Sequence, residues 1–236
     1  WQDAPVTLLR EHYRCHPKII NFCNQKFYHG KLIVMTKDHD EPNVLAMYRT
    51  TAGNHARGHL NQRQIDVIQQ EVLPRLHQQN FESIGIITPY RDQVTAIRRQ
   101  LGDTYAVDTV HKFQGREQDA IILTSVDNVI TDFVDDPHML NVAVSRAVHS
   151  LAVVTSQDPR NDRTNYGDLM RYIEYNNFEV IQSHVYSVFD MLYQGYAEQR
   201  KIYLQKHKRV SEYDSENLMY ALIQEVLSEE AFSSIG

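Results

Sequence analysis

The chain has 236 residues, a formal net charge of −6 and 23% charged residues, the composition of an ordinary globular protein. No apolar run is long enough to cross a bilayer, so we expect no membrane-spanning segment. The acidic balance argues mildly against a compact nucleic-acid-binding module, although it is compatible with a local basic groove. The two cysteines, Cys15 and Cys23, suit free thiols in a reducing compartment, which predicts a cytoplasmic protein.

The two ends of the chain suggest that it is a piece of a longer protein. The sequence begins at Trp1 with neither an initiator methionine nor a secretory pattern. It stops at Gly236, directly after a helical pattern. We therefore expect further domains outside these residues.

Five runs along the chain predict β-strands. Three of them are apolar almost throughout, which is typical of strands buried on both faces of a parallel sheet. The predicted strands are Val44–Arg49, Ile84–Thr88, Tyr105–Val110, Ala120–Val126 and Leu151–Ser156.

Helical patterns lie between the predicted strands. The longest places four apolar residues on one stripe and contains Pro74, which we expect to kink or end the helix. Alternation of strand and helix predicts a doubly wound, mainly parallel α/β domain. The four predicted helices are residues 17–30, 61–79, 90–102 and 137–149, and the stripe is Ile65, Ile68, Val72 and Leu76.

The character of the sequence changes after Ser156. Residues 157–185 read as a polar linker with closing elements that include a short helix at 167–177. Residues 186–236 read as a helical extension. We therefore predict a main domain over residues 1–156, a linker over 157–185 and a helical appendage over 186–236.

The segment "HKFQGRE", from His111 to Glu117, carries more chemistry than a simple connector needs. Ligands of open α/β sheets bind beyond the carboxyl ends of the strands, and a strand ending near Thr109 would deliver this segment there. Gly115 permits a tight turn, and Glu117 can accept hydrogen bonds from a ribose. Thr109, His111 and Lys112 could reach a nucleic-acid phosphate. A charged connector without a ligand explains the segment about as well.

Two other segments place arginines beside apolar runs. In "EHYRCHP", Tyr13 offers a flat ring and Arg14 a planar fork for phosphate oxygens. In "LNVAVSRAVHS", we expect Arg146 on a helix, from which it could stabilise a transferring phosphoryl group. Taken singly, each arginine is explained as well by packing against its neighbours.

These motifs, in this order and spacing, resemble one family. The segments "YRCHP", "ITPYRDQV", "TVHKFQGREQDAIIL" and "LNVAVSRA" are similar to the second RecA-like domain of superfamily I DNA/RNA helicases. The similar branch includes the up-frameshift helicases of nonsense-mediated decay and many bacterial relatives. The resemblance covers about Leu8 to Thr155, and it implies a RecA-like, P-loop NTPase fold.

The resemblance assigns roles to individual residues. It implies that Tyr13 stacks on adenine and that Arg14 and Arg146 contact the γ-phosphate. It also implies that Gly115 lies close to the nucleotide and that Glu117 holds the ribose. The residues that it places on the nucleic acid are Thr88, Tyr90, Thr109, His111 and Lys112.

The sequence departs from a whole helicase because it contains no G-x-x-x-x-G-K-[ST] motif and no acidic metal-binding motif after a strand. The resemblance therefore implies that ATP with Mg2+ is held by an upstream RecA-like domain of the same protein. The complete protein is expected to be an ATP-dependent helicase that acts on single-stranded DNA or RNA. This chain alone is expected to be inactive.

Two alternative functions stay open. The chain could be a non-catalytic nucleic-acid-binding or interaction module with a degenerate motor. It could also tether a nuclease domain that opens near Glu216 and continues beyond Gly236. The cluster of His12, Cys15, His16 and Cys23 matches no common zinc spacing, so we expect no metal site in this chain.

Overall fold

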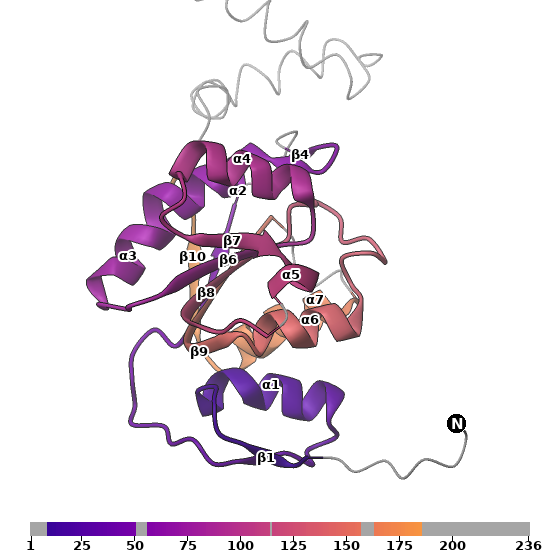
Figure 1. Cartoon of the computed structure of the whole chain (residues 1–236). Helices are drawn as coiled ribbons and strands as arrows, with labels where there is room; N and C mark the ends of the chain where they lie inside the picture. Colours follow the sequence, from indigo (N-terminus) through magenta and orange to yellow (C-terminus); the bar gives the residue numbers. More distant parts are fainter. Residues whose placement is uncertain (1–8, 51–55, 114, 157–162, 186–236) are drawn as a thin grey trace, which may run out of the picture. The chain divides into compact units, whose positions relative to one another are not determined.

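The computed structural model describes residues 9–50, 56–113, 115–156 and 163–185 (Figure 1). The chain divides into two units, Trp1–Val185 and Tyr186–Gly236, and all described residues belong to the first. The predicted helical extension at 186–236, with Glu216, lies outside the described residues.

The first unit is built on a parallel sheet of six strands in the order β10-β3-β9-β8-β6-β7. This order and the helices between the strands confirm the predicted doubly wound α/β fold. All five predicted strands are present. The strands are β3 (Leu45–Arg49), β6 (Ile84–Thr88), β7 (Ala106–Thr109), β8 (Gln118–Thr124), β9 (Ala147–Thr155) and β10 (Glu179–Gln182).

Helices cover both faces of the sheet (Figure 1). Alternate residues of one strand enter different cores: Ile121 of β8 packs on one side and Ile122 on the other. Burial on both faces explains why the strands read as continuous apolar runs. One face carries α1 (Pro17–Phe27), α5 (Val110–Phe113), α6 (Pro137–Val144) and α7 (Asn165–Tyr175). The other carries α2 (Gln62–Val67), the π-helical segment η1 (Ile68–Val72), α3 (Leu73–Gln78) and α4 (Arg91–Leu101).

Two small sheets accompany the main one. Strands β1 (Glu11–His12) and β2 (Ile33–Val34) pair in parallel beside α1. Strands β4 (Ala56–Arg57) and β5 (Leu60–Asn61) pair antiparallel and lead into α2. The β1–β2 pair matters for the site because the chain turns directly from His12 into the segment that carries Arg14.

The predicted helix at 61–79 forms in three successive pieces. The four residues of its apolar stripe are all buried, as the period predicts. The Leu73 N–H bonds the carbonyl of Ile68, five residues back, just before Pro74. Proline has no N–H to donate, and the π-helical turn beside it lets the helix continue.

The predicted helix at 137–149 is wrong in its second half. Helix α6 ends at Val144, and β9 begins at Ala147. Arg146 therefore lies in the turn between helix and strand, not on a helix. Strand β9 pairs with both β8 and β3, and this tertiary pairing outweighs the helical pattern of the local sequence.

Residues 163–185 add to the main fold. Helix α7 corresponds to the short helix predicted at 167–177. Strand β10 pairs with β3 along its whole length. The boundaries of the predicted domains stay a prediction.

The two edges of the parallel sheet carry different motifs. The carboxyl edge, where strands end, contains Thr88 and Thr109. The amino edge, where strands begin, lies beside Glu117 and Arg146, which directly precede β8 and β9. The expectation that the whole of "HKFQGRE" lies at the carboxyl edge is therefore wrong for Glu117, because α5 takes the chain back along the sheet.

Candidate functional site

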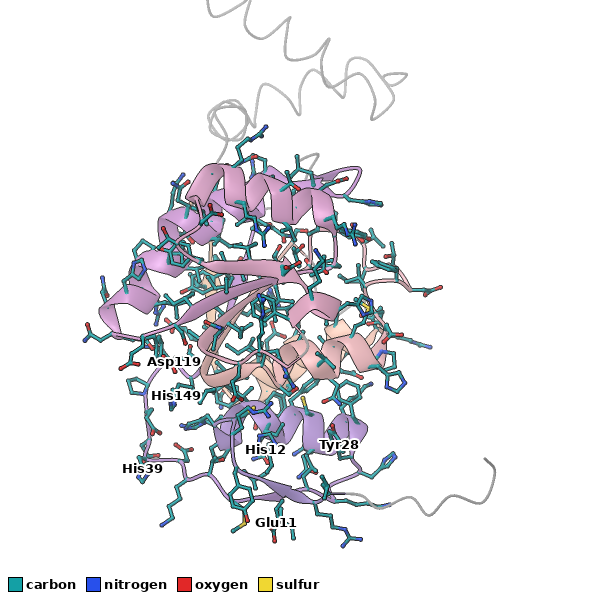
Figure 2. All side chains as sticks on the ribbon, in the orientation of Figure 1. Glu11, His12, Tyr28, His39, Asp119 and His149 are labelled. Carbon is teal, nitrogen blue, oxygen red and sulfur yellow. The ribbon has the colours of Figure 1, made fainter. Side chains whose placement is uncertain are left out.

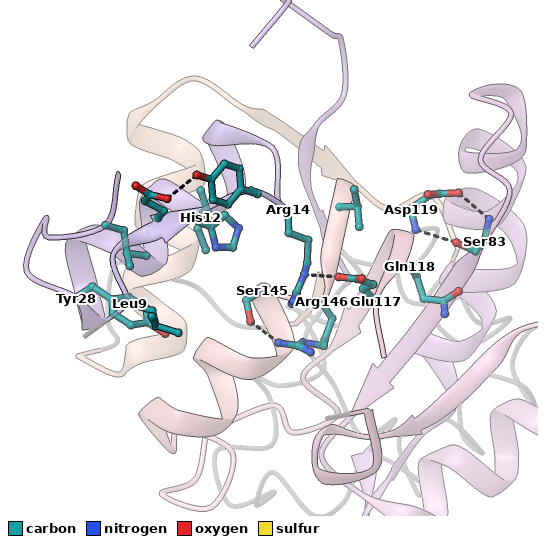
Figure 3. Close-up of a pocket in the computed structure, with 15 residues that line it drawn as sticks. Leu9, His12, Arg14, Tyr28, Ser83, Glu117, Gln118, Asp119, Ser145 and Arg146 are labelled. Carbon is teal, nitrogen blue, oxygen red and sulfur yellow. Dashed lines mark hydrogen bonds and ion pairs between the residues drawn. The ribbon is translucent and has the colours of Figure 1, made fainter. Parts of the chain in front are cut away.

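A hollow of about 740 Å³ opens at the amino edge of the sheet (Figure 3). It is lined by Tyr13, Arg14, Glu117 and Arg146, four residues that the motifs singled out. They come from the turn before α1, the start of β8 and the turn before β9. Figure 2 shows the side chains on the whole ribbon, and its labels mark four residues that line the hollow, Glu11, His12, Tyr28 and Asp119.

The turn that carries Arg14 is fixed to the start of β9. The His16 N–H donates to the carbonyl of Val148 at 2.7 Å. The Cys15 thiol donates to the carbonyl of Ser145 at 3.3 Å, and the Cys15 N–H donates to Nε2 of His12 at 2.9 Å. Residues of the Arg14 turn thus contact the turn that carries Arg146.

Arg146 is held by the end of α6. Its Nε–H donates to the carbonyl of Val142 at 3.1 Å, and an Nη–H donates to Oγ of Ser145 at 3.2 Å. Burial lowers the pKa of Arg146, and the positive charge of Arg14 lowers it further. Two guanidinium groups thus face one hollow, alongside the carboxylates of Glu11, Glu117 and Asp119.

Arg14 forms an ion pair with Glu117 across the hollow (Figure 3). The pair is open to solvent, with 40% of the Arg14 side chain and 51% of the Glu117 side chain exposed. Tyr13 is 66% exposed, and its hydroxyl donates to Glu11. The ring of Tyr13 therefore presents an uncovered face beside the arginines.

Gly115 lies in the turn that leads to Glu117 and has φ +84°. A Cβ placed there would meet nothing within 4 Å, so the glycine serves the left-handed backbone and not close packing. The sequence placed Gly115 near the nucleotide. The structure places it on the same connection as Glu117, one residue before Arg116.

The carboxyl edge holds the residues assigned to nucleic acid. Thr88 has 0% of its surface exposed and Thr109 has 9%, so neither hydroxyl faces open solvent. His111 and Lys112 are exposed on α5, and Tyr90 is half-buried. Helix α5 therefore contributes exposed polar side chains to this edge, while the two threonines lie beneath the surface.

Sequence reasoning missed an aromatic stack at this edge. His59 stacks on Tyr90 with ring centroids 4.2 Å apart, and Phe133 stacks on the same ring at 5.5 Å. The Tyr90 hydroxyl donates to Asp127 at 2.7 Å, which fixes the central ring. Phe133 is 52% exposed. The rings belong to three distant segments, so no local pattern could reveal the stack.

The loop that bears Phe133 starts from an unusual backbone conformation. Val126 is buried and has φ +64°, a region that β-branched residues rarely adopt. The Asn61 side chain donates to the carbonyl of Val126 at 2.7 Å, and the Val126 N–H donates to the side chain of Gln64 at 2.9 Å. Backbone strain that is held by buried side chains is common at functional sites.

One cluster outside the hollow has the composition of a metal site. His16, Asp38 and Glu41 bring ligand atoms within 4.8 Å of one another. The Lys18 N–H donates to Nδ1 of His16 at 3.1 Å, so the neutral ring carries its proton on Nε2. That proton points to Glu41 at 3.1 Å, which leaves no lone pair for a cation. The cluster instead caps α1.

The hollow itself fits phosphate better than a metal. Among its carboxylates, Glu11 accepts from Tyr13, Glu117 pairs with Arg14, and Asp119 accepts two backbone N–H groups. The hollow also presents two guanidinium groups and the exposed ring of Tyr13. A triphosphate and a purine suit these groups, while Mg2+ finds no set of available oxygens among the residues that line the hollow.

Fold and site together define a RecA-like α/β domain with a hollow at its amino edge that is lined by two arginines. The model of the AAA domain family matches residues 2–158, and the chain belongs to that family. Within the described residues, no helix has the length and apolar character that a membrane span needs.

Several proteins similar to this chain are named helicases. It is 28% identical over 193 residues to "Uncharacterized ATP-dependent helicase C05C10.2" of Caenorhabditis elegans, which covers 73% of this chain and 13% of that protein. It is 28% identical over 186 residues to "5'-3' DNA helicase ZGRF1" of Mus musculus, covering 71% and 10%. The chain thus spans a small part of these relatives. Together with the family match, they support a superfamily I helicase domain.

A solved structure with a similar fold is the C-terminal domain of a possible DNA helicase from Lactobacillus plantarum WCFS1. It is 16% identical to this chain, with a TM-score of 0.47. The similarity covers 71% of this chain and 98% of that one.

Proposed function

We propose that the chain is the second, C-terminal RecA-like domain of an ATP-dependent superfamily I helicase, of the bacterial-type up-frameshift branch. It supplies Arg14 and Arg146 to ATP that an upstream RecA-like domain holds with Mg2+. The observation that carries this proposal is that two arginines far apart in sequence line one open hollow. Both cysteines are buried free thiols, which suits a cytoplasmic protein.

The proposed chemistry uses groups already aimed into the hollow. Arg146, anchored on α6, donates to the γ-phosphoryl oxygens as negative charge develops on them. Arg14 exchanges its exposed partner Glu117 for phosphate, because a solvent-exposed ion pair is weak. Glu117 is then released to accept bonds from ribose hydroxyls, and the open face of Tyr13 stacks on adenine.

Turnover in the complete protein tests this assignment. Arg14→Ala and Arg146→Ala are each expected to lower kcat by about 10³-fold or more, the range of an arginine that stabilises a transferring phosphoryl group. Arg99→Ala is the matched control, since Arg99 is exposed on α4, outside the hollow. A kcat within a few-fold of wild type for Arg146→Ala would contradict the assignment of Arg146. Absence of ATP turnover in the complete wild-type protein would instead favour the non-catalytic module.

We further propose that single-stranded DNA or RNA crosses the carboxyl edge. Lys112 supplies an exposed ammonium group and His111 an exposed ring N–H for phosphates, and the half-exposed ring of Phe133 supplies a face for a base. Tyr90 serves this edge as the fixed ring beneath Phe133. The buried threonines Thr88 and Thr109 support the edge from below.

Strand affinity tests the carboxyl edge independently of ATP turnover. Phe133→Ala is expected to weaken binding of a fluorescent oligonucleotide about 5- to 150-fold, since stacking contributes about 1–3 kcal/mol per base. The control is Tyr175→Ala, an aromatic residue that is 89% exposed at the end of α7. Equal affinity of Phe133→Ala and wild type would remove the stack from the proposed path of the strand.

A further inference from the structure

His12 lines the hollow but has no role in the proposed function so far. It lies at the end of β1, directly before Tyr13 and Arg14, and it is half-buried. Its Nε2 accepts the backbone N–H of Cys15 at 2.9 Å. A ring nitrogen that accepts a hydrogen bond needs its lone pair, so the neutral ring carries its proton on Nδ1.

The N–H that His12 accepts belongs to Cys15, in the turn between Arg14 and α1. Cys15 has no exposed surface, and its carbonyl accepts from Oγ1 of Thr36 at 2.7 Å. Its thiol reaches the carbonyl of Ser145, directly before Arg146. Arg14 is thus presented by a turn closed on one side by His12 and fixed on the other to the turn of Arg146 (Figure 3).

We propose that His12 is a positioning residue that holds Arg14 in its place relative to Arg146 only while its imidazole is neutral. This inference rests on the proposed function and adds a regulatory property to the same site. Protonation of Nε2 would set two N–H groups against each other and release the Cys15 end of the turn. It would also add a third cation to a hollow that already contains two.

The surroundings of His12 favour the neutral ring. Burial lowers its pKa below the ordinary 6.5, and the charges of Arg14 and Arg146 lower it further. The charged and titratable groups that share the hollow are Glu11, Tyr13 and Arg14 from its own segment, Tyr28 after α1, Glu117 and Asp119 at β8, and Arg146 before β9. The thiol of Cys15 stays protonated, since burial raises its pKa to about 12.

The sign of the pH effect follows from these shifts. A histidine whose pKa is lowered by folding is neutral near pH 7 and takes up its proton only below pH 6.5. Turnover should therefore fall on the acid side of neutrality as His12 gains its proton. We assign this fall of kcat at acid pH, the acid limb of the profile, to His12. In the proposed arrangement His12 has no assigned contact with the nucleotide or the nucleic acid.

Two substitutions of His12 in the complete protein test the inference. His12→Leu removes the acceptor and is expected to lower kcat about 5- to 100-fold at neutral pH, the effect of an unpaired buried N–H on the arginine turn. His12→Gln offers an oxygen that accepts the same N–H and does not titrate. We expect it to recover most of the turnover that His12→Leu loses and to flatten the acid limb of the kcat profile.

The controls separate this inference from general acid damage and from the proposed function. His138→Gln replaces an exposed histidine on α6 and should keep the wild-type pH profile. An unchanged acid limb in His12→Gln overturns the inference, even where His12→Leu fails to fold. Wild-type kcat in a folded His12→Leu also overturns it. Full turnover in Arg146→Ala, measured alongside, instead marks failure of the proposed function.

Discussion

The substitution Glu117→Gln distinguishes the contribution of Glu117 to folding stability from its proposed role in binding the ribose. The substitution keeps the volume of the side chain and removes the charge that pairs with Arg14. With 40% and 51% of the two side chains exposed, the pair belongs to the solvent-screened class that contributes about 0–1 kcal/mol. The free energy of unfolding of the chain, measured in urea by circular dichroism, should therefore fall by less than about 1 kcal/mol.

The same substitution should have a larger effect on nucleotide binding. A carboxylate that accepts hydrogen bonds contributes about 1.5–3 kcal/mol, so the KM for ATP of the complete protein should rise about 10- to 150-fold. Asp103→Asn, which neutralises an exposed carboxylate just after α4, is the matched control for charge. A loss of more than about 2 kcal/mol of stability with an unchanged KM would refute the reasoning, because the pair would then be structural.

Three further outcomes are expected from the fold. Gly85→Ala would place a Cβ 2.9 Å from side-chain atoms of Phe113, Gln118 and Ile121 and should destabilise the chain by about 1–3 kcal/mol in urea; unchanged stability would contradict the packing around β6. Burial raises the pKa of both thiols, so Cys15 and Cys23 should react with iodoacetamide at pH 8 only after unfolding, and rapid labelling of the native chain would contradict this. Backbone N–H groups lower the pKa of Glu41 from 4.5 to about 2, so its stabilising effect is complete above pH 4.5 and is lost as pH falls towards 2. Glu41→Gln should flatten this part of the acid-unfolding curve, and an identical curve would exclude the group.

The strands could be predicted from the sequence because a strand that is buried on both faces has a continuous run of apolar residues. Every residue of β6 is buried, and its letters are nearly all apolar. The end of α6 could not be predicted in this way. The run around Val144 suits a helix and a strand equally, and the choice is made by pairing of Ala147 with Gln118, a residue distant in sequence.

The candidate site was predictable through its motifs and not through general rules. The motifs singled out Tyr13, Arg14, Glu117 and Arg146, and the structure brings all four to one hollow. The general preference for the carboxyl edge of a parallel sheet pointed to the wrong edge for Glu117. The role of His12 was hidden for a similar reason, because a single hydrogen bond to Cys15 defines it and composition does not.

Helix α6 connects the two edges of the sheet. It begins after the loop that contains Phe133 and ends at Val144, two residues before Arg146. Its eight residues span about 12 Å, and its buried side packs on the core. In the proposed function, the loop of Phe133 contacts the nucleic acid and Arg146 contacts phosphate. One short helix would then connect the two proposed sites, with no β-strand between them.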